Sequence, residues 1–250
     1  TILADDEMPH LANLEVIELK DIDLTAIRQS LDAFGVNTRF DALAVAVLDH
    51  GFAPDISNRL FRFDHLRKLV TSKRNLFAFC YLAHEIPDYL NRIKAVIKSV
   101  RANTPLLVID TGVAAVLGTL QDEEVIRHNE QLIVNVGNSH TIAFNLVDGL
   151  IKGLFEHHTG MLNATILDLL ITKLAQGVLT SEEVYDGGGH GALVVNRDGG
   201  KPFIAITGPR REVLAGSSMK LYQAVPHGDI MLTGCYGLVR ACALRMNDWR

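Results

Sequence analysis

Three apolar segments separated by two tight turns constrain this sequence more than any other feature. The segments run over residues 131–136, 141–147 and 150–155, and each has the length and composition of a β-strand. Gly137-Asn138 follows the first segment, and Asp148-Gly149, a strong hairpin signal, follows the second. Because connections this short join antiparallel neighbours, we predict a three-stranded meander.

The residues after the meander predict a helix, a strand and a second helix. Apolar residues keep a helical period over 166–174, and Gly177 stands where that helix should end. A strand over 203–206 and a long helix over 229–246 follow. A meander followed by helix, strand and helix is the element order of a ribonuclease-H-like unit.

The first half of the chain predicts strands that alternate with helices. The expected strands lie at 14–19, 42–48, 76–82 and 106–109, and the expected helices at 24–34, 57–70 and 89–100. A polar, charged stretch over 121–130 separates the two halves. We therefore predict a partial first α/β domain over 1–120 and a ribonuclease-H-like second domain over 121–250.

Composition and charge exclude several classes of protein. With 24 Lys and Arg against 29 Asp and Glu, the chain lacks the basic surplus of a nucleic-acid binder. We find no apolar run near 18 residues and no secretory leader, so we expect no membrane span; because the sequence begins with Thr1, we allow for an upstream segment. The three cysteines, Cys80, Cys235 and Cys242, form no C-x-x-C pair and indicate buried thiols in a reducing, cytoplasmic compartment.

Polar residues and glycine collect where five of the predicted strands end. These polar segments are 49–51, 110–112, 135–141, 156–160 and 207–211. Ligands of α/β sheets gather at the carboxyl ends of strands, although each segment alone is also ordinary turn chemistry. Five such segments in one chain predict a ligand-binding cleft.

The segment 135–141 has the chemistry of a phosphate-binding turn. Gly137 allows close backbone approach, while Asn138, Ser139 and Thr141 add hydrogen-bond donors. No G-x-x-x-x-G-K-[ST] loop is present. Arg210 and its neighbour Arg211 either bind phosphate as well or form the solvated start of a helix.

Six of the ten histidines lie within two residues of glycine or threonine in predicted loops. They are His50, His140, His157, His158, His190 and His227. Three interpretations are open: hydrogen bonding within the loops, which we favour, a metal site completed by Glu156 and Asp229, and proton transfer near neutral pH. Because adjacent residues of a strand point to opposite sides, His157 and His158 are poorly placed to share a metal ion. We assign no metal ligands.

Small residues line one face of each of two predicted helices. Gly234, Gly237 and Ala241 recur at spacings of three and four, and a second small-residue face spans 114–118. Glycine inside a helix costs about 1 kcal/mol relative to alanine, so close approach of another backbone or a ligand is expected. We predict that the two helices cross through Ala115, Gly118, Gly234 and Gly237.

Together these segments resemble the actin-like ATPase superfamily, which includes actin, heat-shock chaperones and sugar and acetate kinases. The four matching segments occur in the family's order: first connecting helix, 110–118; second phosphate loop, 132–144; adenosine turn, 204–211; second connecting helix, 228–243. The resemblance covers about the last 150 residues well, and the first 100 only by alternation of strands and helices. It implies a nucleotide cleft between two ribonuclease-H-like domains, of which the first lacks its N-terminal strands.

Four segments resemble a narrower prokaryotic family labelled "putative pyruvate formate-lyase activating enzyme". The segments are 135–141, 155–161, 187–192 and 226–234. The label implies radical S-adenosylmethionine chemistry, which needs a C-x-x-x-C-x-x-C cluster motif. This sequence has no such motif, so we expect no iron–sulfur cluster and do not carry the activity over.

The superfamily resemblance implies a set of site residues and a ligand. The ligand would be a small phosphorylated molecule, with ATP or another nucleotide plus magnesium as the implied cofactor, and the reaction ATP hydrolysis or phosphoryl transfer. Asp110, Asn135 and His140 are the candidate catalytic residues, with Asn135 in place of the usual aspartate. The candidate binding residues are Gly137, Asn138, Ser139, Thr141, Thr207, Gly208, Arg210 and Gly234. We expect Thr207 and Gly208 on the cleft wall opposite the hairpin turn at residues 137–139.

Two alternatives to an ATPase or kinase remain open. Asn135 cannot act as a carboxylate base, which favours a binding or regulatory protein that has lost its catalytic acid. The loop histidines favour a metal-dependent hydrolase instead.

Overall fold

The first of two β-sheets has three strands in the part of the chain that the computed structural model describes, residues 20–100 and 104–246. Its strands are β1 (Leu43–Ala46), β2 (Cys80–Leu82) and β3 (Leu106–Ile109). β3 lies in the middle, parallel to β1 and antiparallel to β2. This small sheet fits the partial first domain; the strand expected at 14–19 lies outside the described residues.

The second sheet has six strands and contains the predicted meander. The strands are β4 (Glu130–Val136), β5 (His140–Val147), β6 (Leu150–His158), β7 (Gly191–Val194), β8 (Phe203–Thr207) and β9 (Tyr222–Gln223). Their order is β7-β6-β5-β4-β8-β9, with β4, β5 and β6 antiparallel and β8 parallel to β4. A meander whose first strand takes a parallel neighbour on its free side confirms the ribonuclease-H-like order. The turn between β5 and β6 has positive φ at both Asp148 and Gly149, as a tight hairpin requires.

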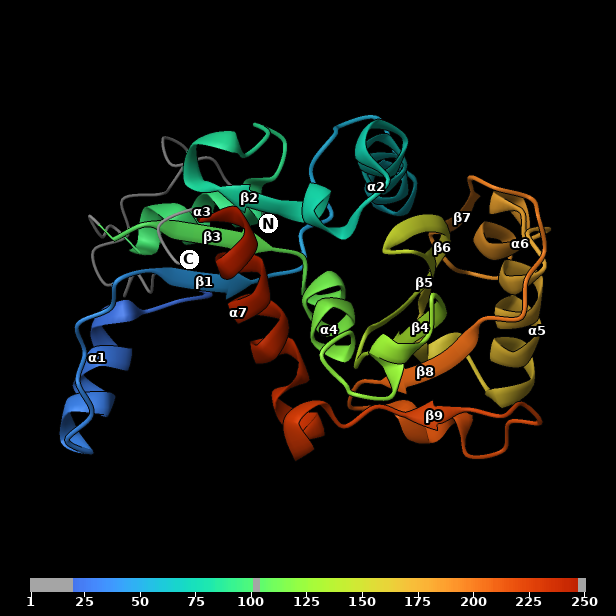
Figure 1. Cartoon of the computed structure of the whole chain (residues 1–250). Helices are drawn as coiled ribbons and strands as arrows, with labels where there is room; N and C mark the ends of the chain where they lie inside the picture. Colours follow the sequence, from blue (N-terminus) through green and yellow to red (C-terminus); the bar gives the residue numbers. More distant parts are fainter. Residues whose placement is uncertain (1–19, 101–103, 247–250) are drawn as a thin grey trace.

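Seven helices connect and cover the sheets in the described residues (Figure 1). They are α1 (Leu24–Ala33), α2 (Asn58–Lys73), α3 (Asn91–Val100), α4 (Thr111–Thr119), α5 (Ala164–Ala175), α6 (Ser181–Asp186) and α7 (Thr233–Arg245). Short 3₁₀ turns lie at Leu76–Phe79, Ala83–Glu85, Val125–Arg127, Thr159–Met161, Arg211–Leu214, Pro226–Gly228 and Ile230–Leu232. α4 and α7 run side by side between the two sheets, and α5 and α6 cover the other face of the second sheet. None of the described helices combines the length and apolarity needed to cross a membrane.

Local capping explains where the structure departs from the predicted elements. Residues 76–79 form a 3₁₀ turn instead of a strand, because the Asn75 side chain accepts a hydrogen bond from Ala78 N. The last helix begins at Thr233, since Asp229 caps the preceding short turn. α6 and β7 were not expected, although Thr180 and Glu183 form a capping box at the start of α6.

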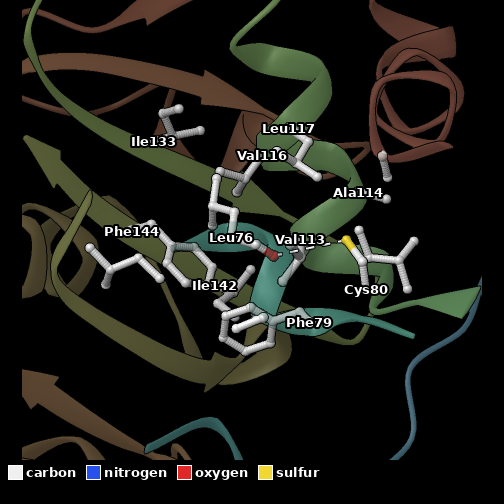
Figure 2. Packing of buried hydrophobic residues seen from close by; sticks show 14 of the residues in the cluster. Leu76, Phe79, Cys80, Val113, Ala114, Val116, Leu117, Ile133, Ile142 and Phe144 are labelled. Atoms are coloured by element: carbon white, nitrogen blue, oxygen red, sulfur yellow. Dashed lines mark hydrogen bonds between the residues drawn. The ribbon is translucent and has the colours of Figure 1, made fainter. Parts of the chain in front are cut away.

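One hydrophobic core contacts both sheets through α4 (Figure 2). Val113, Val116 and Leu117 of α4 are almost fully buried in the same cluster as Ile133 of β4 and Phe144 of β5. β1 to β3 precede the proposed domain boundary at residue 120 and β4 to β9 follow it, yet α7 packs back against β1. The two halves of the chain therefore share a core.

The cysteines are only partly as expected. Cys80 and Cys242 are buried, but Cys235, two turns before Cys242 at the start of α7, is exposed. The expectation of buried thiols is therefore confirmed for Cys80 and Cys242 and wrong for Cys235.

Backbone contact between α4 and α7 confirms the predicted helix crossing. A Cβ atom placed on Gly118 would lie 1.7 Å from the carbonyl oxygen of Thr233, and one on Gly237 would lie 1.8 Å from that of Ala114. Gly234 faces open space, so its predicted part in the crossing is wrong. Glycine at 118 and 237 is required because no side chain fits between the two backbones.

This difference between Gly237 and Gly234 gives a matched test in one helix. Gly237→Ala should lower the free energy of unfolding by about 1–3 kcal/mol or more, because the new methyl group overlaps the backbone of α4. Gly234→Ala should leave it unchanged or raise it by up to about 1 kcal/mol, since alanine favours helix. Chemical denaturation of both variants measures the difference; equal effects would contradict the crossing.

Candidate functional site

One cavity, of about 450 Å³, lies where strands of both sheets end. Each of the five polar segments contributes at least one residue to its lining: His50, Asp110 with Thr111 and Gly112, Asn135 with residues 137–140, Glu156, and Pro209. The predicted convergence of these strand ends is therefore confirmed.

Arg62 of α2 forms a buried ion-pair network at the floor of this site. Its side chain is about 3% exposed, and its Nη2 lies 2.7 Å from Asp110 Oδ2 and 2.9 Å from Glu156 Oε1. Burial alone would lower the pKa of Arg62, but Asp110 and Glu156 raise it above its usual value. Arg62 thus stays charged between two carboxylates, and the three groups carry a formal charge of −1. The sequence pattern gave no signal for Arg62, because an arginine in an amphipathic helix is normally solvated.

Both carboxylate oxygens of Asp110 have partners. Oδ1 accepts hydrogen bonds from Gly112 N (2.9 Å) and Val113 N (3.3 Å) at the start of α4, while Oδ2 faces Arg62. Asp110 therefore caps a helix and neutralises a buried cation. Its catalytic role stays a prediction, and a base at this position would have to separate from Arg62 first.

Asn135 ends β4 at the cavity and neighbours the turn after β8. It lies in register with Thr207 in the parallel pair β4–β8, and a Cβ on Gly208 would meet Val136 O at 2.4 Å. Thr207 and Gly208 therefore stand beside the hairpin in the same sheet, and their predicted place on the opposite wall is wrong. The opposite wall comes from the first half of the chain, with Leu48, His50 and Thr111.

The hairpin residues 137–139 line the cavity, and the other predicted binding residues do not. Thr141 is buried with its hydroxyl 2.9 Å from that of Thr159, and Arg210 pairs with Glu212 at the surface. Thr207, Gly208 and Gly234 are also absent from the lining. A side chain at Gly137 would meet His140 O at 2.6 Å, so a larger residue there would distort the hairpin itself.

Histidines from three separate chain segments meet beside the hairpin. Ring nitrogens of His50, His140 and His190 all lie within 4.8 Å of one another. His158 pairs with His140 across β5 and β6, and its ring centroid lies 4.8 Å from that of His190. His157 points away from this cluster of rings, as strand alternation predicts. Its Nδ1 lies 3.1 Å from the carbonyl oxygen of His158.

The predicted partners of these histidines are only partly correct. Glu156 Oε2 lies 3.3 Å from His190 Nδ1, so Glu156 does belong to the cluster. Asp229 caps Met231 N, and His227 packs on Tyr236, so neither joins it. Burial is the main cause that lowers the pKa of His50 and His140, and it lowers that of His190 to about 2. All three rings are therefore neutral at physiological pH.

A further buried histidine lies behind Arg62. His65 Nδ1 is 3.0 Å from the hydroxyl of Tyr89, and Nε2 is 3.2 Å from that of Tyr81. Burial and then the charge of Arg62 lower the pKa of His65 to about 4, against 6.5 for a free side chain. Between these two pH values the unfolded chain binds a proton that the folded chain does not, so acidification destabilises the fold.

Replacing His65 should therefore reduce the acid sensitivity of the fold. Between pH 6.5 and 4.5, wild type should lose about 1.4 kcal/mol of unfolding free energy per pH unit more than His65→Gln. Denaturation curves at several pH values measure both slopes. Parallel slopes for the two proteins would show that His65 does not titrate in this way.

Comparison with solved structures finds distant similarities with low TM-scores. The chain is similar to the ethanolamine utilization protein EutJ from Carboxydothermus hydrogenoformans, with 13% identity, coverage of 61% of each chain and a TM-score of 0.32. The chain thus spans about three fifths of the length of EutJ. It is also similar to MreB5 of Spiroplasma citri bound to AMPPNP, with 10% identity, coverage of 81% of this chain and 79% of that one, and a TM-score of 0.37.

A family model identifies the chain more directly. No curated protein matches it. The model described as "Putative pyruvate format-lyase activating enzyme" matches residues 3–213, which is most of the sequence. The chain therefore belongs to the family that carries this description.

Proposed function

We propose that the cavity binds a phosphorylated small molecule, with a nucleotide as the foremost candidate. The observation that carries this proposal is the cavity at which five polar strand ends from both sheets meet. Its volume of about 450 Å³ lies within the range of small-molecule sites, about 300–1,000 Å³. Ligands of open α/β sheets bind at such carboxyl ends.

The short polar side chains of the lining suit phosphate oxygens. Asn138 and Ser139 are exposed at the tip of the hairpin, and Thr111 adds a hydroxyl from the facing wall. Arg92 also lines the cavity, but Asp21 holds its guanidinium at 2.7 and 2.8 Å. The lining therefore offers hydrogen-bond donors for a phosphate group, whereas its arginine, Arg92, is already paired with a carboxylate.

The carboxylates at the cavity do not fit a magnesium ion. Mg²⁺ binds oxygen ligands in octahedral geometry, and Asp110 and Glu156 already share Arg62. Asn135 supplies an amide oxygen where the family resemblance expects a carboxylate. For this reason we propose ligand binding as the function and derive no hydrolytic step; a regulatory protein without catalysis is favoured by Asn135.

The residues do not fit the iron–sulfur cluster that the family description implies either. Such a cluster needs three or four closely set thiolates. Cys80 and Cys242 are buried in the core, while Cys235 is exposed. Burial raises the pKa of Cys80 to about 12, which opposes the thiolate form.

Ligand binding can be tested with a charge introduced at the hairpin. Isothermal titration calorimetry with ATP, ADP and inorganic phosphate should detect binding to wild type. Asn138→Asp should weaken it at least tenfold, because the new carboxylate repels the phosphate at close range. Asn196→Asp makes the same change on an exposed loop outside the cavity lining and should leave affinity unchanged. If no ligand binds at millimolar concentration, the proposal is wrong.

The cluster chemistry can be tested separately. Anaerobic reconstitution with iron and sulfide should give no four-iron cluster, and the protein should not cleave S-adenosylmethionine, because the thiols are too few and too dispersed. Iron analysis and visible absorbance make the measurement. A stoichiometric cluster would restore the activity named in the family description.

A further inference from the structure

Two histidine rings beside the cavity have ring nitrogens without partners. Nε2 of His190 and Nε2 of His140 are buried and have no hydrogen-bond partner among residues 20–100 and 104–246. Burying a polar atom without a hydrogen-bond partner destabilises the fold. The hydrogen-bonding interpretation of these histidines therefore fails at the positions where the rings meet, and a ligand that binds nitrogen would remove the cost.

The geometry points to a metal ion as that ligand. The ligand nitrogens of His50, His140 and His190 lie within 4.8 Å of one another, whereas nitrogens around a tetrahedral zinc ion lie about 3.3 Å apart. The rings come from the loop after β1, the start of β5 and the residue before β7. Small rotations of side chains on three separate segments would bring the nitrogens to bonding distance.

We propose that His50, His140 and His190 bind a divalent transition-metal ion, with zinc as the foremost candidate. Three imidazoles leave one tetrahedral position for water or a ligand oxygen, as in catalytic zinc sites. His50 and His140 line the cavity, so the open position faces it. Neutral imidazole is the form that binds metal, so binding should weaken as the pH falls and the rings take up protons.

Glu156 supports the same assignment as a positioning residue. Its Oε2 lies 3.3 Å from His190 Nδ1, and Arg62 holds the carboxylate through Nε and Nη2 at 3.1 and 2.9 Å. Metal-binding histidines commonly direct their second nitrogen to a carboxylate, which fixes the ring and its tautomer. With His190 Nδ1 directed to Glu156, its Nε2 is left for the metal.

A bound divalent ion would also supply the charge that the cavity lacks, a consequence that rests on the proposed function. Arg62, Asp110 and Glu156 together carry −1, and a divalent ion on three neutral ligands changes the sum to +1. The phosphate of a ligand would then meet a cation beside the donors of the hairpin. Phosphate affinity should therefore depend on the metal.

Metal binding is measured first, without any phosphate. Protein without a histidine tag is stripped with chelator, reloaded with Zn²⁺, dialysed and analysed for zinc; Co²⁺ is followed by visible absorbance. Wild type should retain one equivalent and give the intense spectrum of a tetrahedral cobalt site. His140→Ala and His50→Gln should each weaken binding at least 100-fold, while His84→Ala, at an exposed histidine on a 3₁₀ turn, should not.

The outcomes separate this proposal from the proposed function. Failure of wild type to retain zinc or cobalt overturns the metal site, as does an equal loss in His84→Ala. His50 is only half-buried, so His50→Gln keeps the test valid if His140→Ala unfolds, and thermal denaturation checks both. Phosphate titrations with and without zinc follow: zinc retention without phosphate binding supports the metal site and rejects the proposed function. Phosphate binding without zinc retention supports the proposed function and rejects the metal site.

Discussion

The buried guanidinium of Arg62 is the interaction on which the arrangement of the two halves depends. It joins α2 to the end of β3 through Asp110 and to β6 of the second sheet through Glu156. Removing one partner of a buried ion pair typically costs about 3–5 kcal/mol, because the remaining charge is left unpaired away from water. Three segments far apart in the sequence are thus held at one point, and both carboxylates that pair with Arg62 line the cavity.

The close crossing of α4 and α7 acts on the same region from the other side. Gly118 and Gly237 allow the two backbones to touch, which places the start of α4 against the second sheet. Asp110 is both the N-cap of α4 and a partner of Arg62. A shift of α4 would therefore also move the carboxylate that pairs with Arg62. A cavity wall built in this way is preorganised, since neither Asp110 nor Glu156 is free to rotate.

Local sequence signals predicted the elements better than the contacts between them. Hairpin turns depend on neighbouring residues, so Asp148 and Gly149 were sufficient to place β5 and β6. The five polar strand ends likewise predicted the cavity. The two-residue β9 and the 3₁₀ turn at 76–79 have no periodicity to detect, and a side-chain cap decided the latter. The ion pairs of Arg62 and the contact between His50 and His190 join residues that are far apart in the sequence. No local sequence pattern therefore predicts them.

Asn135 and Arg62 are best understood as two parts of one change in the charge of this cavity. Asparagine at position 135 removes a negative charge that the superfamily resemblance would place there, and Arg62 neutralises one of the two carboxylates that remain. Both features weaken a site for a hard cation with oxygen ligands. They leave the neutral imidazoles of His50, His140 and His190 as the main uncommitted ligands beside the cavity among the described residues. Nitrogen ligands favour softer transition metals, so the ion that we propose for this cavity differs in class from one held by carboxylate oxygens.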